Sequence, residues 1–378
     1  MPAYDVIVLG LGGMGSAAAY QAVRRGARVL GLEQFGPAHD QGSSHGRTRV
    51  IRQAYSEGPD YVPLLFRAYE LWSELEREAG AALFTKTGAL HLGAPDSDAV
   101  AGAALSARTH HIPHEMLSAD EIRRRYPVLR PRPDQVALLE YEAGILPPER
   151  CVAAYLDLAK RRGAELRFEE PVLSWSAGSG GVTVRSAAGT YAARRLIIAA
   201  GPWTGQVLED LGLPLQVSRA VVYWFEPRSN RQAFKEIPIY LWEDRGVYAY
   251  GFPYLDGQGL KCAFHHAHDE VTTPQTIRRG VGEDERSQMR EHLAKLMPDA
   301  AGDVLAVSTC MYTNTPDLHF LIDRHPRHEQ VVLACGFSGH GFKFASVVGE
   351  VLADLALEGR TELPIDLFAL RRFASRTG

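Results

Sequence analysis

The first residues whose types and spacing could do chemistry are three glycines near the N-terminus, Gly10, Gly12 and Gly15. They follow the β-branched apolar run 6–9 and precede an alanine-rich stretch, 16–25, that is typical of a helix. In a dinucleotide-binding fold the first glycine permits the tight turn, the second lets the backbone approach a pyrophosphate, and the third lets helix and strand pack closely. The three glycines are therefore predicted to bind the phosphates of a cofactor at a helix N-terminus.

A carboxylate supports the same interpretation. Glu33 follows a second predicted strand, 27–32, near the spacing of about 20 residues at which an acid hydrogen-bonds ribose hydroxyls. Its charge would repel a 2′-phosphate, which leaves NAD or FAD. A glycine turn alone also closes ordinary strand-to-helix junctions, but strand, turn, helix and acid together favour nucleotide binding.

The elements after Glu33 favour FAD over NAD. An NAD domain would continue with regular strand–helix alternation, whereas the segment 35–52 is rich in Gly, Ser, His and Arg. A glycine-rich loop, 336–341, precedes a helix predicted over 343–358, and such a loop can stabilise the negative charge of a reduced flavin. An ordinary surface turn is the alternative. Nucleotide-domain character otherwise returns at a helix, 149–162, and at strands 165–168, 196–200 and 331–334.

The remaining segments read as a different kind of sheet. Short alternating strands are predicted at 83–92, 219–226, 237–242, 247–252 and 260–265, followed by an amphipathic helix at 285–296. We therefore predict an α/β fold with a Rossmann-like FAD-binding domain built from discontinuous segments and a substrate domain with a mainly antiparallel sheet. The expected boundaries are 1–80, 141–215 and 305–378 for the FAD-binding domain, and 81–140 and 216–304 for the substrate domain.

Composition excludes several other classes of function. The 378 residues carry a net charge of −4, so no long-range field attracts nucleic acid or anionic lipid. No apolar run reaches the roughly 20 residues of a membrane span, and the N-terminus has no pattern of a secretory signal. The sequence thus predicts a cytoplasmic protein with no membrane and no nucleic-acid partner. Its four cysteines, which form no CxxC pair and argue against a disulfide framework, are Cys151, Cys262, Cys310 and Cys335.

The reactive side chains also have interpretations that involve no function. Cys310 lies in a β-rich stretch and on its own would be a buried, inert thiol. Arg52 and Lys343 on their own would be surface charges. His265, His266 and His268 could suggest a metal, but strand alternation places His265 on the opposite face from the other two, and no metal site is predicted.

Three motifs resemble the monomeric sarcosine oxidase family. They are the segments 45–52 and 336–344 and the tetrapeptide Cys310-Met311-Tyr312-Thr313, and similar stretches at 58–63, 84–88, 251–253 and 259–261 extend the likeness nearly end to end. The resemblance implies oxidation of a secondary amino acid to an imine, reoxidation by molecular oxygen to hydrogen peroxide, and a flavin bound through a cysteine thioether. Sarcosine is the first substrate expected. The alternatives are N-methyltryptophan, pipecolate or proline, a flavin dehydrogenase with another acceptor, and a non-catalytic flavin-binding subunit.

The resemblance also implies roles for individual residues. Cys310 corresponds to the thioether cysteine, Arg52 and Lys343 to the pair that binds the substrate carboxylate, and Lys261 to a lysine beside flavin N5. The expected catalytic residues are Lys261, His265, Arg49 and Tyr250, with Tyr312 as a further substrate contact. The expected cofactor contacts, besides the glycine turn, Glu33 and Cys310, are His45, Arg49, Val172, Gly201, Trp203, Gly339, Gly341 and Lys343.

Two positions depart from that family, which carries an acid in place of Arg47 and a histidine in place of Gln53. An extra cation at position 47 can alter how the flavin is attached or the redox potential of the flavin. A cationic site is expected to lower the pKa of a bound ammonium group, so the rate should rise with pH; its residues are Arg49, Arg52, Lys261 and Lys343. A monomer that takes a small secondary amino acid and oxygen is expected.

Overall fold

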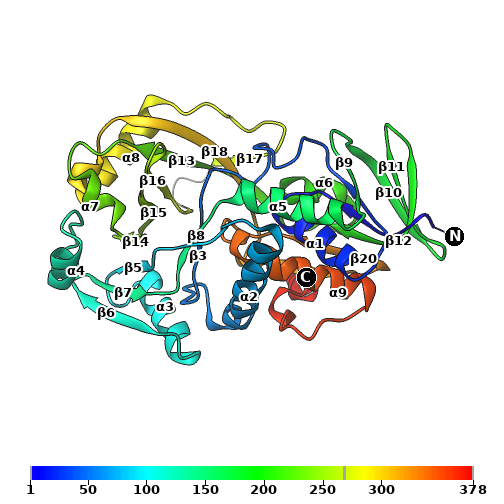
Figure 1. Ribbon diagram of the computed structural model, residues 1–378, viewed down its shortest axis with the longest axis horizontal. Helices are drawn as coiled ribbons and strands as arrows, with labels where there is room; N and C mark the ends of the chain where they lie inside the picture. Colours follow the sequence, from blue (N-terminus) through cyan, green and yellow to red (C-terminus); the bar gives the residue numbers. More distant parts are fainter. Residues whose placement is uncertain (1, 267–269, 377–378) are drawn as a thin grey trace.

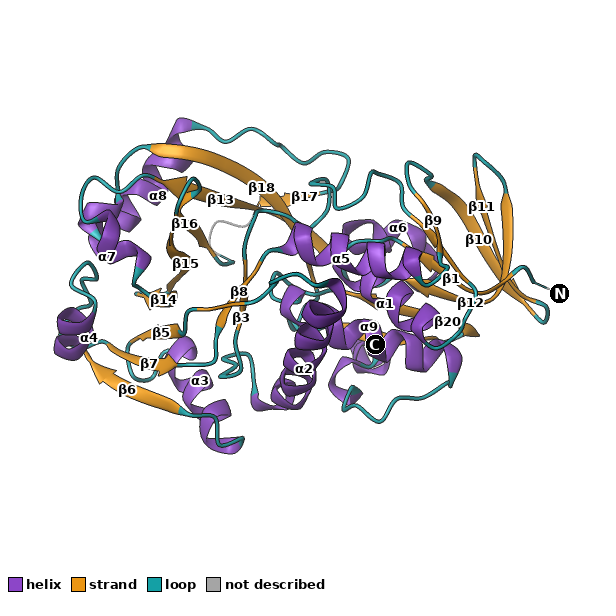
Figure 2. Cartoon of the chain, viewed as in Figure 1, coloured by secondary structure: helices purple, strands orange, loops and turns teal. Residues whose placement is uncertain are grey.

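The computed structural model describes residues 2–266 and 270–376 and shows an elongated molecule (Figure 1). Two large sheets lie one after the other along its longest axis, as the orange strands in Figure 2 show. The end that holds the N-terminus contains the first sheet, and the opposite end contains the second (Figure 1). The α/β architecture expected from the sequence, with one sheet in discontinuous segments, is confirmed.

The first sheet has a parallel core in the order β9-β2-β1-β12-β20. The hairpin β10–β11 continues it antiparallel beside β12, and β19 pairs antiparallel with β20. Parallel strands covered on both faces require continuous apolar runs, and residues 6–9 of β1 are accordingly all buried. The strands are β1 (Tyr4–Leu9), β2 (Val29–Leu32), β9 (Glu165–Arg167), β10 (Val172–Gly178), β11 (Gly181–Ser186), β12 (Thr190–Ile198), β19 (Leu321–His325) and β20 (His328–Cys335).

Four helices cover this sheet towards the middle of the molecule (Figure 1). They are α1 (Gly13–Arg24), α2 (Val62–Ala79), α5 (Pro148–Arg161) and α9 (Ala345–Leu357), with α1 packed against α5 and α9. Helices α2 and α5 bury one apolar stripe each, and α1 and α9 are buried on nearly every side. In α9 the expected stripe is Val348, Val351, Leu352 and Leu355, and in α2 it runs from Leu64 to Leu75, so both stripes are core packing as the periodicity predicts.

The second sheet is mainly antiparallel, with one parallel pair between β5 and β14. A difference from expectation concerns β18, which pairs along its length with β13 and places Cys310 opposite Ala220 in this second sheet. Residues 305–314 had been expected on the FAD-binding side. The strands are β5 (Ala89–Gly93), β6 (His114–Ser118), β7 (Val136–Glu140), β13 (Gln216–Phe225), β14 (Ile239–Asp244), β15 (Val247–Leu255), β16 (Gly259–Phe264), β17 (Glu270–Thr272) and β18 (Val304–Asn314).

A small sheet of β3 (Arg49–Ile51), β4 (Thr85–Lys86) and β8 (Gly144–Leu146) lies between the two large ones (Figure 1). The strand expected over 83–92 is split into β4 and β5, because Gly88 takes a φ of +70° and turns the chain. The other helices are α3 (Asp98–Thr109), α4 (Ala119–Arg125), α6 (Thr204–Val207), α7 (Arg231–Lys235) and α8 (Glu283–Leu296). Within the described residues, none of the helices is long and apolar enough to cross a membrane.

Candidate active site

The turns that follow four neighbouring parallel strands meet at one edge of the first sheet. Leu9 is in register with both Leu32 and Ile198, and Ile198 with Leu333, so these strands end level. The carboxyl ends of parallel strands are where ligands bind in open α/β sheets. The turns line a cavity of about 1110 Å³, and residues of β3, β15 and β18 line its far side.

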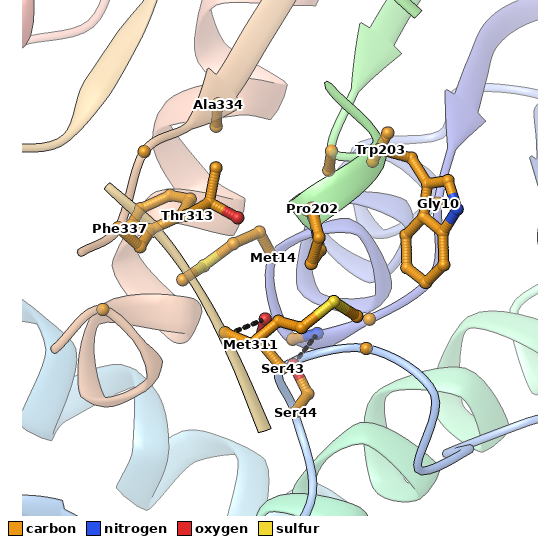
Figure 3. Close-up of a pocket in the computed structure, with 18 of the residues that line it drawn as sticks. Gly10, Met14, Ser43, Ser44, Pro202, Trp203, Met311, Thr313, Ala334 and Phe337 are labelled. Carbon is orange, nitrogen blue, oxygen red and sulfur yellow. Dashed lines mark hydrogen bonds between the residues drawn. The ribbon is translucent and has the colours of Figure 1, made fainter. Parts of the chain in front are cut away.

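The glycine turn is as tight as the sequence predicts. Gly10 has a φ of +87°, and a Cβ there would lie 2.6 Å from the carbonyl oxygen of Ala199. A Cβ on Gly15 would lie 1.8 Å from the carbonyl oxygen of Gly10, so only glycine lets α1 pack this closely on β1. Gly13 N donates to Ser44 Oγ at 3.0 Å, which joins the turn to the loop before β3 (Figure 3).

Glu33 lies where an acid that binds a ribose is expected. It follows β2 directly, lines the cavity and is buried. Its carboxylate accepts hydrogen bonds from Leu11 N at 2.8 Å and Phe35 N at 3.1 Å, which fix its orientation towards the glycine turn. Turn, acid and cavity size together suit a dinucleotide.

Other expected cofactor contacts lie around the same cavity. Trp203 lies on the side of Gly10, with Phe337 and Thr313 across the cavity, as Figure 3 shows. Of the expected contacts, Gly15 and His45 do not line the cavity, and those that do include Gly12, Val172, Gly201, Trp203, Gly339 and Gly341.

Cys310 differs from the other cysteines in its electrostatic surroundings. Burial alone would raise the pKa of its thiol, but His45, Arg49 and Lys261 outweigh burial and lower the pKa to about 7. Burial raises the pKa of the Cys151, Cys262 and Cys335 thiols instead. The thiolate is the nucleophilic form of cysteine, so Cys310 is the cysteine prepared to react at the cavity wall.

Two side chains expected on the flavin side lie close to this thiol. Arg49 donates from Nη2 to Ser43 O at 2.9 Å, and the same nitrogen lies 3.7 Å from Cys310 Sγ. His45 is buried, and its Nε2 has no hydrogen-bond partner among the described residues. Because buried polar nitrogens are almost always paired, an unpaired nitrogen on a histidine that neighbours Cys310 is what a site for an additional group would show.

Lys261 is 2% exposed and lies behind the cavity wall, not on it. Its Nζ donates to Gly46 O at 2.6 Å, Thr48 O at 2.8 Å and Thr48 Oγ1 at 3.1 Å. Burial, followed by the nearby Arg49, holds the pKa of Lys261 well below its ordinary value. The lysine therefore supports the loop that carries Arg49, and its three donated hydrogen bonds suit an ammonium group.

Arg52 and Lys343, the expected carboxylate pair, both line the cavity and are both buried. Arg52 Nη2 donates to both carboxylate oxygens of Glu57, at 2.9 and 2.6 Å. One nitrogen of the guanidinium is therefore already paired with a carboxylate of the chain itself. The Nε of Arg52 has no partner among the described residues. Lys343 Nζ donates to His340 O at 2.5 Å, and burial together with Arg52 lowers its pKa to about 7.

Aromatic side chains close the same end of the cavity. Tyr250, Tyr312 and His265 all line it, and the His265 ring lies 5.7 Å from that of Tyr312 and 6.2 Å from that of Tyr250. Burial, followed by His266, lowers the pKa of His265 well below its ordinary value, so the imidazole is neutral. Burial raises the pKa of Tyr250 and Tyr312, so both hydroxyls keep their protons.

Residues 5–355 match the FAD dependent oxidoreductase family over most of the chain. The chain belongs to this family. The resemblance expected from its motifs is confirmed by monomeric sarcosine oxidase from Streptomyces avermitilis, which is 54% identical and covers 99% of each chain. N-methyl-L-tryptophan oxidase from Citrobacter koseri is 36% identical over 98% of this chain and 99% of its own. The solved structure of NikD, an unusual amino acid oxidase essential for nikkomycin biosynthesis, superposes with a TM-score of 0.84 at 27% identity and covers 97% of each chain.

This FAD-dependent oxidoreductase also uses acids that the sequence did not single out. Glu140, fully buried in β7, accepts from Gln53 N at 2.6 Å and Ala54 N at 2.9 Å, immediately after Arg52. Glu149, in the first turn of α5, accepts from Gly46 N at 2.6 Å. These pairings join segments far apart in the chain, so no local spacing announces them. Glu57 is different. It lies only five residues after Arg52, so its pairing with that arginine could have been predicted from the sequence.

The departures at Arg47 and Gln53 do not put new side chains on the cavity wall of the oxidoreductase. Arg47 is exposed, and its guanidinium carbon lies 4.7 Å from the ring centroid of Trp224. Its φ of +68° places the backbone in the left-handed region, where Glu149 accepts from Arg47 N at 3.0 Å. The expected effect of this cation on the flavin stays a prediction.

The histidine pair at the end of β16 corrects one expectation. His265 and His266 do not lie on opposite faces, since their rings are 4.3 Å apart and both pack against Tyr312. The strand ends at Phe264, and His266 takes a φ of +54°, so strand alternation no longer applies. His268 lies outside the described residues. Within residues 2–266 and 270–376, no three His, Cys, Asp or Glu side chains gather as a metal site would need.

Proposed function

We propose that this chain is a sarcosine oxidase, which converts sarcosine, oxygen and water into glycine, formaldehyde and hydrogen peroxide. The observation that carries the proposal is one cavity that joins a nucleotide-binding turn to two buried cations, Arg52 and Lys343. The 54% identity to a monomeric sarcosine oxidase over the whole chain supports the same substrate.

The residues present suit FAD. Backbone amides at Gly12 and the start of α1 would bind the pyrophosphate, Glu33 the ribose, and Arg49 the isoalloxazine side. Bound FAD supplies an acceptor for the hydride that leaves the carbon next to the amine nitrogen. The chain contributes orientation, charge and exclusion of water around that step.

Cys310 is proposed to carry the FAD through a thioether. The support is chemical. The Cys310 thiol is buried on the cavity wall and has a pKa of about 7, whereas the other three cysteines are expected to be inert. A thiolate at neutral pH is the nucleophilic form of cysteine. The new C–S bond would replace a C–H bond of FAD, with the proton released to solvent and the two electrons passing to the flavin and then to molecular oxygen, the co-substrate. Arg49, 3.7 Å from Sγ, stabilises that thiolate.

The substrate is proposed to bind with its carboxylate at Arg52 and Lys343. Arg52 offers its unpaired Nε, and Lys343 adds a compact charge from the 3₁₀ turn Phe342–Phe344 that leads into α9. The pair also repels a proton on the substrate nitrogen, and the neutral His265 can accept a hydrogen bond from a secondary amine. Tyr250 and Tyr312, which line the cavity beside His265, would pack against the substrate.

Lys261 is proposed to assist reoxidation by oxygen, since a cation favours the superoxide-like charge that forms in that half-reaction. Its place behind Gly46 and Thr48 means that it acts through that loop or after a side-chain movement. Lys261→Met should slow reoxidation far more than reduction in stopped-flow traces. Equal slowing of both half-reactions would remove this role.

The division into domains is also proposed. The segments 1–80, 141–215 and 305–378 would bind FAD and the segments 81–140 and 216–304 would supply the substrate side, with β18 bringing Cys310 to the cofactor from the second sheet. A monomeric state and a cytoplasmic location are proposed as well.

Peroxide release from a panel of amines tests the substrate. Sarcosine should give the highest kcat/KM, above N-methyltryptophan, pipecolate and proline, in line with the 54% identity to a monomeric sarcosine oxidase. The rings of Tyr248, Tyr250 and Phe252 line the cavity that the larger amino acids would have to share. Dimethylamine, which lacks the carboxylate, serves as the matched control and should be a poor substrate. If dimethylamine is oxidised as efficiently as sarcosine, the carboxylate assignment is wrong. If another amine of the panel exceeds sarcosine, the substrate assignment is wrong.

A further inference from the structure

Both cations of the proposed carboxylate site lie over one aromatic ring, that of Tyr55. The guanidinium carbon of Arg52 is 4.4 Å from the ring centroid, and Lys343 Nζ is 5.0 Å from it. Tyr55 is fully buried. The π-face of an aromatic ring attracts cations, and more strongly where water is absent. The ring therefore offsets part of the repulsion between two like charges that the site must hold together.

The hydroxyl of Tyr55 fixes the orientation of this ring. Tyr55 Oη lies 2.5 Å from His340 Nδ1, and His340 Nε2 lies 3.0 Å from the carbonyl oxygen of Leu318. Because a carbonyl only accepts, Nε2 carries the proton, and Nδ1 accepts from the tyrosine. Burial lowers the pKa of His340 to about 4, which keeps the imidazole neutral at physiological pH.

His340 also connects the ring to one of the cations. Its carbonyl oxygen accepts the 2.5 Å hydrogen bond from Lys343 Nζ. On the other side, Ser106 Oγ donates to Tyr55 O at 2.6 Å and holds the tyrosine backbone in place. Tyr55 is thus anchored at both ends and touches Arg52, Lys343 and the residue that orients Lys343.

We propose that Tyr55 is a positioning residue of the carboxylate site, its ring holding Arg52 and Lys343 together and its hydroxyl aligning Lys343 through His340. The inference rests on the proposed function, in which these two cations bind the substrate carboxylate. Tyr55 does not line the cavity and acts only through the two cations.

The chain offers a matched control in Tyr61. It is also fully buried, packs 4.9 Å from the Tyr55 ring, and bonds a histidine through its hydroxyl, His319 Nδ1 at 2.8 Å. Among the contacts of the described residues, none places a cation over the Tyr61 ring. Variants of Tyr61 therefore disturb the same aromatic cluster without touching the cations directly.

The test measures the Kd of the holoenzyme for (methylthio)acetate from the flavin absorbance, together with kcat and KM for sarcosine. Tyr55→Leu should raise Kd and KM by about ten- to thirtyfold, with a much smaller change in kcat. Tyr55→Phe, which keeps the π-face and loses the hydroxyl, should recover most of the affinity and stay within about fivefold of wild type. Tyr61→Leu and Tyr61→Phe should stay within about twofold.

Three outcomes would overturn the inference. One is a wild-type Kd in Tyr55→Leu, the second is an equal loss in Tyr61→Leu, and the third is a fall in kcat at unchanged KM. If Tyr55→Leu does not fold, the comparison of Tyr55→Phe with Tyr61→Phe decides, because only the former should raise Kd. Arg52→Lys and Lys343→Met test the carboxylate site separately from the role of Tyr55. Wild-type affinity in both would refute the carboxylate site itself, whereas loss in both with normal Tyr55 variants would refute only the role of Tyr55.

Discussion

At the scale of residues, the site holds its cations with oxygens that carry no full charge. Arg49 is bonded to Ser43 O, Lys261 to Gly46 O and Lys343 to His340 O. Backbone carbonyls orient a cation without neutralising it, so a positive field persists in the cavity. Arg52 is the exception, because Glu57 pairs with it. This field lowers the pKa of the Cys310 thiol and adds to the effect of burial on Lys261 and Lys343, and it should favour anionic ligands.

The first residue-scale prediction concerns Cys310. Acid precipitation of the purified protein should leave the yellow flavin in the pellet, because a thioether survives denaturation. Cys310→Ser should release the flavin to the supernatant, whereas Cys262→Ser, which changes a buried thiol in strand β16 of the same sheet, should not. Flavin that stays in the supernatant with the wild-type protein would show that no covalent bond forms.

The second residue-scale prediction concerns the pH dependence of anion binding at Lys343. Its ammonium, with a pKa lowered to about 7, is present below that pH and is lost above it. The affinity for acetate-type anions should therefore fall as pH rises through about 7, in a titration of Kd from about pH 6 to 9. Lys343→Arg, charged throughout this range, should flatten the curve. The groups that face Lys343 are Arg49, Arg52, Glu57, Tyr55 and His340. A Kd that does not vary in the wild type would contradict the assignment.

At the scale of elements, the turns after the parallel strands could be predicted and the lateral pairings could not. The glycine spacing and Glu33 announce the first two turns, and apolar runs announce β12 and β20. Nothing local announces that β18 joins β13, because a strand's partner depends on the whole topology. Periodicity also failed at His266, where the chain leaves the strand. The hydrogen bonds of Glu140 and Glu149 could not be predicted either, because each acid accepts from the backbone of a distant segment.

The element-scale prediction concerns the contact between α1 and β1. Gly15→Ala would put a methyl group 1.8 Å from the carbonyl oxygen of Gly10, so the helix must shift away from the strand. We expect a loss of about 1–3 kcal/mol in unfolding free energy and weaker FAD binding, measured by thermal melting and flavin content. Gly205→Ala in α6, where a Cβ meets nothing within 4 Å, is the control and should be near neutral. Normal flavin content in Gly15→Ala would argue against phosphate binding at this turn.

At the scale of the whole molecule, the two sheets share one cavity and each contributes part of the chemistry. The turns after the strands of the first sheet supply the glycine turn and Glu33, and the second sheet supplies Cys310 and Tyr250 to the cavity wall, with Lys261 behind it. A flavin bonded to Cys310 would therefore link both sheets through one ligand. The family resemblance and the two-sheet fold were predictable from motifs and patterning. The place of Lys261 behind the cavity wall depends on side-chain packing and was not predictable.

The most direct test of the central claim is to mix the yellow holoenzyme with sarcosine in the absence of oxygen and then to admit air. The proposed oxidase should lose its yellow flavin absorbance and regain it in air as hydrogen peroxide appears. Bleaching without recovery in air would indicate a dehydrogenase that needs another electron acceptor. No bleaching with sarcosine would contradict the account.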